Sequence, residues 1–357
     1  MSGPAGAGER LRDRFAGALL GTFAGDALGM PVENWPAAKI ARTLGRLDHF
    51  RTAAMWLRGY AIVYGSLYDP IHSFGRAPLA RGTYTDDTQM TIAVAESLAE
   101  CGGFDGADMA RRFVESFDPR RGYGRGTIQA IHVLRRGVPW DKVGPSLFGG
   151  TGSFGNGAAM RAAPLALFYN RDPAKLREAV SASSAITHAH SLGIEGALIQ
   201  AAAIMLALES GMSGRPIQHT SFLATLAERS GPIGEVFSRK LDGVRELLAA
   251  DPSTADIVDC LGANATAQGS VPAAVYAFLR NSENLKEAIV FAVSLGGDTD
   301  TIGAMTGAIA GAYHGATAIP RDWLDALENG PKGRAYVERL ANQLFEASGN
   351  STAPASD

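Results

Sequence analysis

Cysteine is scarce in this sequence: the 357 residues include only Cys101 and Cys260, and neither belongs to a C-x-x-C pair. This scarcity argues against a disulfide framework and against a zinc–thiolate site, since both need several cysteines at defined spacings. The chain also lacks an excess of one charge sign, because 33 Lys and Arg stand against 36 Asp and Glu, a net charge of −3. General binding to nucleic acid or to a membrane surface, which a basic excess normally supports, is therefore not expected.

Targeting signals and long apolar runs are lacking too. Residues 1–8 are small and show no basic region followed by an apolar run. The most apolar stretch, residues 196–208, contains Gln200 and is too short to span a bilayer. We therefore expect a cytoplasmic protein with a single domain over residues 9–346, flanked by flexible tails at 1–8 and 347–357.

Helical periodicity, in contrast, is abundant. Apolar residues recur at every fourth position from Leu11 to Ala27, which predicts an amphipathic helix over residues 9–28. Seven further segments show the same pattern: residues 88–99, 174–186, 192–208, 235–249, 285–295, 301–313 and 334–345. No run of alternating β-branched residues bounded by turns is found. The pattern predicts an all-α fold of ten or more helices.

Residues 47–82 interrupt this pattern, because they are rich in aromatic residues and contain Pro70 and Pro78. We expect a partly helical insertion over one end of the molecule. Its aromatic side chains either shape the specificity for an acceptor or pack together. Packing is favoured, because aromatic residues at mixed spacing usually belong to a core.

Two short segments place pairs of carboxylates at the starts of predicted helices: Thr83-Tyr84-Thr85-Asp86-Asp87-Thr88 and Gly296-Gly297-Asp298-Thr299-Asp300-Thr301. Either segment alone is typical of helix capping, in which Asp and Thr satisfy free N–H groups and suit the helix dipole. Together, four carboxylates and the neighbouring hydroxyls could hold two hard divalent cations. Without a cation the four acidic groups would repel one another. The pattern alone leaves capping and a metal site both open.

Two further carboxylates stand out near the first predicted helix. Asp26 lies close to the end of an otherwise apolar helix, where a charge is costly unless it has a partner. Glu33 follows in a loop beside Pro31, where a carboxylate is free to act as a general acid or base. The alternative for Glu33 is a solvated loop side chain without a chemical role.

A glycine-rich loop and a pair of histidines complete the candidate set. Residues 149–157 contain five glycines, and such a loop can cradle phosphates with its exposed backbone N–H groups. It lacks the Gly-Lys-Ser/Thr of a P-loop, so a flexible connector is an equal alternative. His188 and His190 have no third histidine nearby, and a polar contact to a ligand or a structural role is favoured over metal binding.

Taken together, these segments resemble the ADP-ribosylglycohydrolase family, which includes the dinitrogenase reductase-activating glycohydrolase and the ADP-ribosylarginine and ADP-ribosylserine hydrolases. The matching pieces occur in the family's order over residues 15–315. They are Gly25-Asp26-Ala27-Leu28-Gly29 with Glu33, Thr85-Asp86-Asp87-Thr88, Gly155-Asn156-Gly157-Ala158-Ala159-Met160-Arg161, Thr187-His188 and Gly297-Asp298-Thr299-Asp300-Thr301. Five motifs in sequence make the resemblance specific.

The resemblance implies a compact, orthogonal multi-helix bundle with a binuclear Mg²⁺ or Mn²⁺ centre. Carried over by motif, the metal ligands would be Thr85, Asp86, Asp87, Asp298, Asp300 and Thr301. Asp26 would support them from behind, and Glu33 matches the family's catalytic glutamate. The positions that match contacts to the substrate are Phe148 against the adenine, Gly152, Ser153, Phe154, Gly155, Asn156 and Gly157 along the diphosphate and ribose, and His188 at the phosphates.

The implied reaction is metal-dependent hydrolysis of the bond between ADP-ribose and a protein side chain, arginine or serine, or a small acceptor. Free ADP-ribose is the product, and an ADP-ribosylated protein or a small ADP-ribosyl conjugate is the partner. The segments around Thr187 and Asp298 lean towards the serine-type branch. The alternatives are a non-catalytic ADP-ribose-binding or structural member of the family and a hydrolase of O-acetyl-ADP-ribose.

Overall fold

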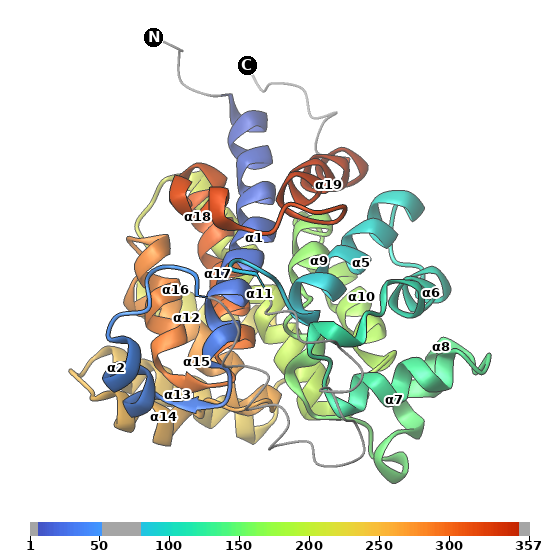
Figure 1. The fold of residues 1–357 in the computed structure, drawn as a ribbon, viewed down its shortest axis with the longest axis horizontal. Helices are drawn as coiled ribbons and strands as arrows, with labels where there is room; N and C mark the ends of the chain where they lie inside the picture. The colour runs from blue at the N-terminus through green and yellow to red at the C-terminus, as the bar shows by residue number, and fades with distance from the viewer. Residues whose placement is uncertain (1–5, 52–79, 350–357) are drawn as a thin grey trace.

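The computed structural model describes residues 6–51 and 80–349, which form an all-α fold (Figure 1). These ranges hold 17 α-helices and two strands of two residues each. The predicted fold class is therefore confirmed. Most of the aromatic-rich insertion and most of the two expected tails fall on residues outside the described ranges, so their structure stays a prediction.

The helices are, in chain order, α1 (Ala7–Gly29), α2 (Ala37–Leu44), α5 (Asp86–Cys101), α6 (Gly106–Ser116), α7 (Arg125–Leu134), α8 (Trp140–Ser146), α9 (Ala163–Phe168), α10 (Pro173–Ala185), α11 (Ser191–Ser213), α12 (His219–Arg229), α13 (Glu235–Leu248), α14 (Thr254–Leu261), α15 (Val271–Arg280), α16 (Leu285–Ser294), α17 (Thr299–His314), α18 (Arg321–Ala326) and α19 (Arg334–Ala347). All eight helices predicted from periodicity are present. The other nine were not predicted. Among them, α15 was missed because nearly all of its residues are apolar and buried, so that the sequence shows little polar face.

Helices α1 and α17 lie against each other in the middle of the bundle (Figure 1). Small residues four positions apart form their contact: Gly17 faces Gly311, Gly21 faces Gly307, Gly25 faces Gly303 and Gly29 faces Thr299. A Cβ atom on any of the four α1 glycines would collide with the facing backbone of α17. The missing side chains therefore let the two antiparallel backbones touch, and they fix which residues of the two helices lie opposite each other.

This pairing brings the end of α1 to the start of α17. After α1 the chain enters β1 (Trp35–Pro36), which pairs antiparallel with β2 (Gly296–Gly297). The N–H of Asn34 also donates to the carbonyl oxygen of the second β2 residue at 2.7 Å. Glu33 comes just before this short ladder and Asp298 just after it, so the backbone holds two residues from opposite ends of the chain together.

Two helices of the described ranges are long and apolar enough to cross a membrane, one over Ala7–Val32 and the other α11. The expectation that residues 196–208 are too short to span a bilayer was wrong, because they belong to the 23-residue α11. The most apolar 18-residue window of each helix is largely buried inside the protein, 94% in the helix over Ala7–Val32 and 72% in α11. Both helices contribute to the main hydrophobic core. Because core helices of globular proteins pass the same length test, the two helices are weak evidence for a membrane.

Candidate active site

The start of α5 is capped by one local side chain and by one from α1. The hydroxyl oxygen of Thr85 accepts a hydrogen bond from the N–H of Asp87 at 3.4 Å. The fully buried carboxylate of Asp26 accepts from the N–H groups of Thr85 and Thr88 at 3.0–3.1 Å and from the Thr88 hydroxyl at 2.5 Å. These bonds satisfy N–H groups that have no partner within the helix. The carboxylates of Asp86 and Asp87 are thus free for another role.

The carboxylate of Asp87 has one partner and one open position. Its Oδ2 atom accepts from the hydroxyl of Thr85 at 2.9 Å. Its Oδ1 atom is buried and has no hydrogen-bond partner in the part of the chain that the structure describes. A buried acceptor without a partner is costly, and a bound cation would remove that cost.

The start of α17 is built differently, on a sharp turn of two glycines. Gly296 and Gly297 have φ values of 77° and 73°, a left-handed conformation that favours glycine. Asp298 occupies the N-cap position but makes no capping hydrogen bond with its side chain. It accepts instead from the side-chain amide of Asn156. The only backbone N–H bonded by these two carboxylates among the described residues is that of residue 301, which donates to Asp300. Helix capping therefore does not explain the side chain of Asp298.

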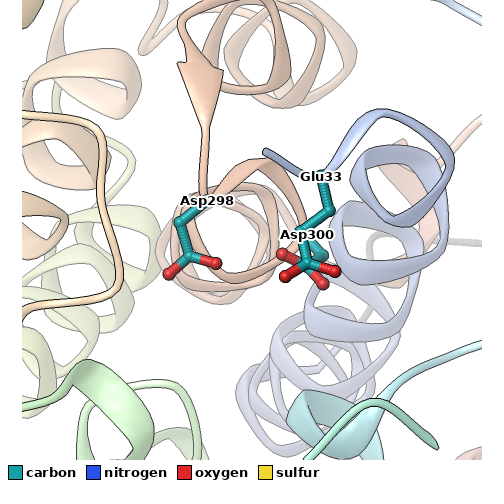
Figure 2. Close-up of side chains that lie close together, drawn as sticks. All are labelled: Glu33, Asp298 and Asp300. Atoms are coloured by element: carbon teal, nitrogen blue, oxygen red, sulfur yellow. The ribbon is translucent and has the colours of Figure 1, made fainter. Parts of the chain in front are cut away.

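Glu33, Asp298 and Asp300 point into the same space, as Figure 2 shows. One carboxylate oxygen from each lies within 4.8 Å of the other two. The two aspartates are buried, whereas Glu33 is half-buried and accepts a hydrogen bond from the side chain of Asn34 at 3.2 Å. The sequence predicted an acid–base role for Glu33. Its place among the aspartates also makes it a candidate cation ligand, which the sequence pattern did not indicate.

Burial and mutual repulsion perturb the aspartates of the site. Burial raises the pKa of Asp86, Asp87 and Asp300 well above the usual value, and neighbouring carboxylates raise it further. Burial also raises the pKa of Asp298, although the hydrogen bond from Asn156 acts in the opposite direction. Carboxylates this close cannot all be charged without a compensating cation. The donor set consists of oxygen atoms, which suits a hard cation such as Mg²⁺ or Mn²⁺.

A cavity of about 230 Å³ opens between these segments and the glycine-rich loop. Eleven of the predicted site residues line it: Glu33, Asp86, Asp87, Ser153, Gly155, Asn156, Gly157, His188, Asp298, Asp300 and Thr301. The five predicted residues that do not line it are Asp26, Thr85, Phe148, Gly152 and Phe154. Asp26 and Thr85 instead support the start of α5, as their hydrogen bonds show.

The two exposed aromatic residues of the loop stand outside the cavity. Phe148 and Phe154 are 49% and 46% exposed, unusual values for large apolar side chains. The ring of Phe148 lies beside Gly126, since a Cβ atom placed on Gly126 would be 3.2 Å from the ring. Gly126 itself lines the cavity. The ring of Phe154 makes an edge contact with His190, whose Nδ1 accepts the N–H of Leu192 and so caps α11. A flat ligand ring could therefore stack at the Phe148 edge.

The glycine-rich loop itself is fastened to the segment before α15. The N–H of Asn156 donates to the carbonyl oxygen of Ala265 at 3.1 Å, and the N–H of Ala267 donates to that of Phe154 at 3.0 Å. His188 lies behind the loop and is almost completely buried. Burial, helped by the positive charge of Arg161, lowers the pKa of His188 to about 3. The imidazole is therefore neutral at neutral pH.

Sequence reasoning missed one wall of the cavity, residues 122–127. Gly122, Gly124 and Gly126 line it together with Arg125, the first residue of α7. Arg125 is exposed, and its side chain makes no hydrogen bond or ion pair with another described residue. The signal was present, since three glycines at alternate positions around the start of a helix resemble the glycines of residues 149–157.

Comparisons with known proteins agree with this geometry. The sequence profile of the ADP-ribosylglycohydrolase family matches residues 7–354. The ADP-ribosylhydrolase ARH3 of Gallus gallus is 35% identical, with 93% of either chain covered, and that of Homo sapiens is 33% identical over 94% of this chain and 93% of its own. A solved structure described as an ADP-ribosylglycohydrolase-related protein complex has a TM-score of 0.69 and 29% identity, covering 95% of this chain and 99% of its own. The chain therefore belongs to the ADP-ribosylglycohydrolase family, and it is a hydrolase of glycosyl bonds.

Proposed function

We propose that this enzyme cleaves the glycosidic bond between C1″ of ADP-ribose and a serine side chain, releasing free ADP-ribose. One observation carries the reaction class: five carboxylates, a glycine-rich loop and a neutral histidine surround a single cavity. The serine linkage is supported by the resemblance of the segments around Thr187 and Asp298 to the serine-type branch. The similarity to ADP-ribosylhydrolase ARH3 proteins supports hydrolysis of an ADP-ribosyl bond in general.

The aspartates would hold two divalent cations, Mg²⁺ or Mn²⁺. The proposed ligands are Thr85, Asp86, Asp87, Asp298, Asp300 and Thr301, with Glu33 as a further candidate. Such ions, when bound, stabilise developing negative charge and lower the pKa of a bound water. The orphaned oxygen of Asp87 and the repulsion among the aspartates support their presence. The chain itself supplies rigidity, because Asp26 fixes the start of α5 and Asn156 fixes Asp298.

Glu33 is our candidate for proton transfer. Glycoside cleavage passes through an oxocarbenium-like state, and it needs a proton for the leaving oxygen and a deprotonated water for attack. The carboxyl of Glu33 is the least buried of the three that converge in Figure 2, so acceptor and water can both reach it. The hydrogen bond from Asn34 orients this carboxyl.

The opposite wall would bind the ADP part of the substrate. Ser153, Gly155, Asn156 and Gly157 line this wall with small side chains, which leave room for the diphosphate close to the backbone. His188 lies directly behind the last of these residues. The exposed ring of Phe148 would stack on the adenine, since aromatic faces bind nucleobases by stacking.

The test is release of ADP-ribose from two peptides, one ADP-ribosylated on serine and the other on arginine. Each peptide is incubated with the protein and Mg²⁺, Mn²⁺ or EDTA. We expect release that EDTA abolishes and that is faster from the serine-linked peptide. Faster release from the arginine-linked peptide would overturn the linkage, and release that persists in EDTA would overturn the role of the metal.

Two alternatives are separated by a further pair of measurements. If ADP-ribose raises the melting temperature in a cation-dependent way but neither peptide is cleaved, the chain is an ADP-ribose-binding protein. Hydrolysis of O-acetyl-ADP-ribose with no action on either peptide would identify a small-molecule substrate. The presence of every motif carboxylate favours the catalytic function over both binding and structural roles.

A further inference from the structure

Arg161 carries a positive charge into the protein interior without a carboxylate partner among the described residues. Its side chain is fully buried, and the guanidinium lies 4.7 Å from the ring centre of Phe113. One Nη donates to the carbonyl oxygen of Gly157 at 3.0 Å; the other donates to that of Ser183 at 3.1 Å and to Oγ1 of Thr187 at 2.8 Å. A buried cation destabilises the fold, so we expect Arg161 to have a role that offsets this cost.

These three hydrogen bonds of Arg161, which also contacts the sulfur of Met90, tie together segments that surround His188. Gly157 belongs to the glycine-rich loop, Ser183 to α10, and Thr187 directly precedes the histidine. A guanidinium has a rigid fork of donors, so its bonds fix these segments at defined distances from one another. The bond to Thr187 has a second consequence, because it decides which way that hydroxyl points.

A guanidinium can only donate, so the Thr187 oxygen is the acceptor in that bond. The hydroxyl hydrogen of Thr187 is then free to donate, and Nδ1 of His188 lies 2.7 Å from the oxygen. Thr187 is fully buried, and its hydroxyl has no other hydrogen-bond partner among the described residues, so a protonated Nδ1 would leave the hydroxyl hydrogen without an acceptor. This arrangement favours Nδ1 as the acceptor, without a proton. In a neutral imidazole the proton then sits on Nε2, since one of the two nitrogens is always protonated.

The Nε2 atom of His188 faces the glycine-rich loop. A Cβ atom placed on Gly157 would lie 2.8 Å from it, and one placed on Gly155 would lie 3.3 Å from it. His188 and both glycines line the cavity. Within residues 6–51 and 80–349 the Nε2 atom has no hydrogen-bond partner, so an N–H at this position is available to a ligand in the cavity.

We propose that Arg161 and Thr187 are positioning residues that hold His188 as the Nε2–H tautomer, so that a neutral imidazole donates a hydrogen bond to an oxygen of the substrate diphosphate. The ligand in this proposal rests on the proposed function; the tautomer does not. The opposite tautomer would direct a lone pair at the phosphate oxygens and repel them. The buried arginine thus acts on the ligand through two intervening side chains.

The tautomer is measured on the free wild-type protein by long-range ¹H–¹⁵N correlation of ¹⁵N-labelled histidines at neutral pH. A His188→Gln variant identifies which of the seven imidazole signals belongs to His188. We expect an unprotonated Nδ1 and a protonated Nε2. A protonated Nδ1 would overturn the proposal without any reference to catalysis.

A pair of matched variants then tests the relay. Thr187→Val removes the hydroxyl and keeps the shape, whereas Thr187→Ser keeps the hydroxyl. We expect Thr187→Val to mix the tautomers, to weaken ADP-ribose binding about 10-fold, the scale of one hydrogen bond to a charged group, and to raise KM more than it lowers kcat. Thr187→Ser should retain the wild-type tautomer and most of the affinity. If Thr187→Val does not fold, the tautomer in the wild-type spectrum and the affinity of Thr187→Ser still test the proposal.

Two outcomes would contradict the relay: wild-type binding by a folded Thr187→Val protein, or an equal loss in the serine variant. The proposed function fails separately. If the wild-type protein binds no ADP-ribose and cleaves neither peptide, the proposed function is wrong, while the spectrum of the free protein still reports whether Arg161 and Thr187 set the tautomer.

Discussion

The carboxylate of Asp26, in α1, accepts the hydroxyl hydrogen of Thr88, in α5, at 2.5 Å, and both side chains are buried. The same carboxylate takes the N–H groups of Thr85 and Thr88. One helix therefore caps another, and the segment that carries Asp86 and Asp87 is anchored to a residue that does not line the cavity. The geometry of the cation site depends on α1 through this contact.

Replacing Asp26 tests that dependence. Asp26→Asn keeps the shape, but its NH₂ group would face donors on Thr85 and Thr88 instead of accepting from them. We expect a loss of unfolding free energy of about 1–3 kcal/mol, the cost of unsatisfied buried donors, and weaker Mn²⁺ binding in calorimetry. Asp13→Asn is the control, because Asp13 makes comparable bonds to Thr317 at an exposed position. Equal losses in the two variants would contradict the proposed anchoring role.

The glycine contact between α1 and α17 gives a second prediction. In Gly21→Ala the new methyl group would collide with the backbone of Gly307. We expect a loss of about 1–3 kcal/mol in unfolding free energy, as overpacking usually causes, measured by chemical denaturation. Gly8→Ala in the same helix is the control, because no described atom lies within 4 Å of its Cβ position. The Gly8→Ala variant should keep or slightly gain stability. A Gly21→Ala protein as stable as the Gly8→Ala protein would contradict the close contact.

Cation binding should depend on pH in a defined direction. The pKa values of Asp86, Asp87 and Asp300 are raised by burial and by neighbouring carboxylates, so protons compete with the cation at a higher pH than for ordinary aspartates. Affinity for Mn²⁺ should therefore weaken as the pH falls from 8 towards 5, and binding should release protons. Calorimetry in two buffers of different ionisation enthalpy counts those protons. Binding without proton release, at an affinity independent of pH, would show that the aspartates are not the ligands.

The sequence predicted eight of the 17 described helices and most of the cavity lining, because these leave local signals. The four-residue apolar period of α1 and the paired carboxylates of residues 85–88 and 298–301 are visible without a structure. The short ladder between β1 and β2 is not, since two-residue strands have no period. It is this ladder that brings Glu33 to Asp298 and makes the glutamate a candidate ligand.

Contacts between distant segments set the limit of the sequence reading. Arg161 was visible only as the last residue of a motif, and its bonds to Ser183 and Thr187 follow from packing. Residues 122–127 were missed for a different reason. They carry no carboxylate or histidine that would have marked them, and their glycines were not compared with those of the loop at 149–157.

The exposed Arg125 on that missed wall gives a fourth prediction. It stands beside the carboxylates of the cavity, and its positive charge could meet the diphosphate of the substrate. Arg125→Gln should weaken ADP-ribose binding about 10-fold, as loss of a charge-assisted hydrogen bond would, with little effect on stability. Arg215→Gln, which removes an exposed arginine outside the cavity, should bind like the wild type. Equal affinity of the two variants would exclude a contact of Arg125 with the ligand.

Glu33→Gln separates catalysis from binding. The amide keeps the size of the side chain and the contact with Asn34, but it can neither donate a proton to the leaving group nor take one from water. We expect turnover to fall about 10²–10⁴-fold, the usual contribution of a general acid or base, while ADP-ribose still binds. Glu246→Gln, on the exposed face of α13, is the control and should keep full turnover. If Glu33→Gln also loses Mn²⁺ affinity, Glu33 is a cation ligand; if it retains full turnover, Glu33 has no part in the reaction.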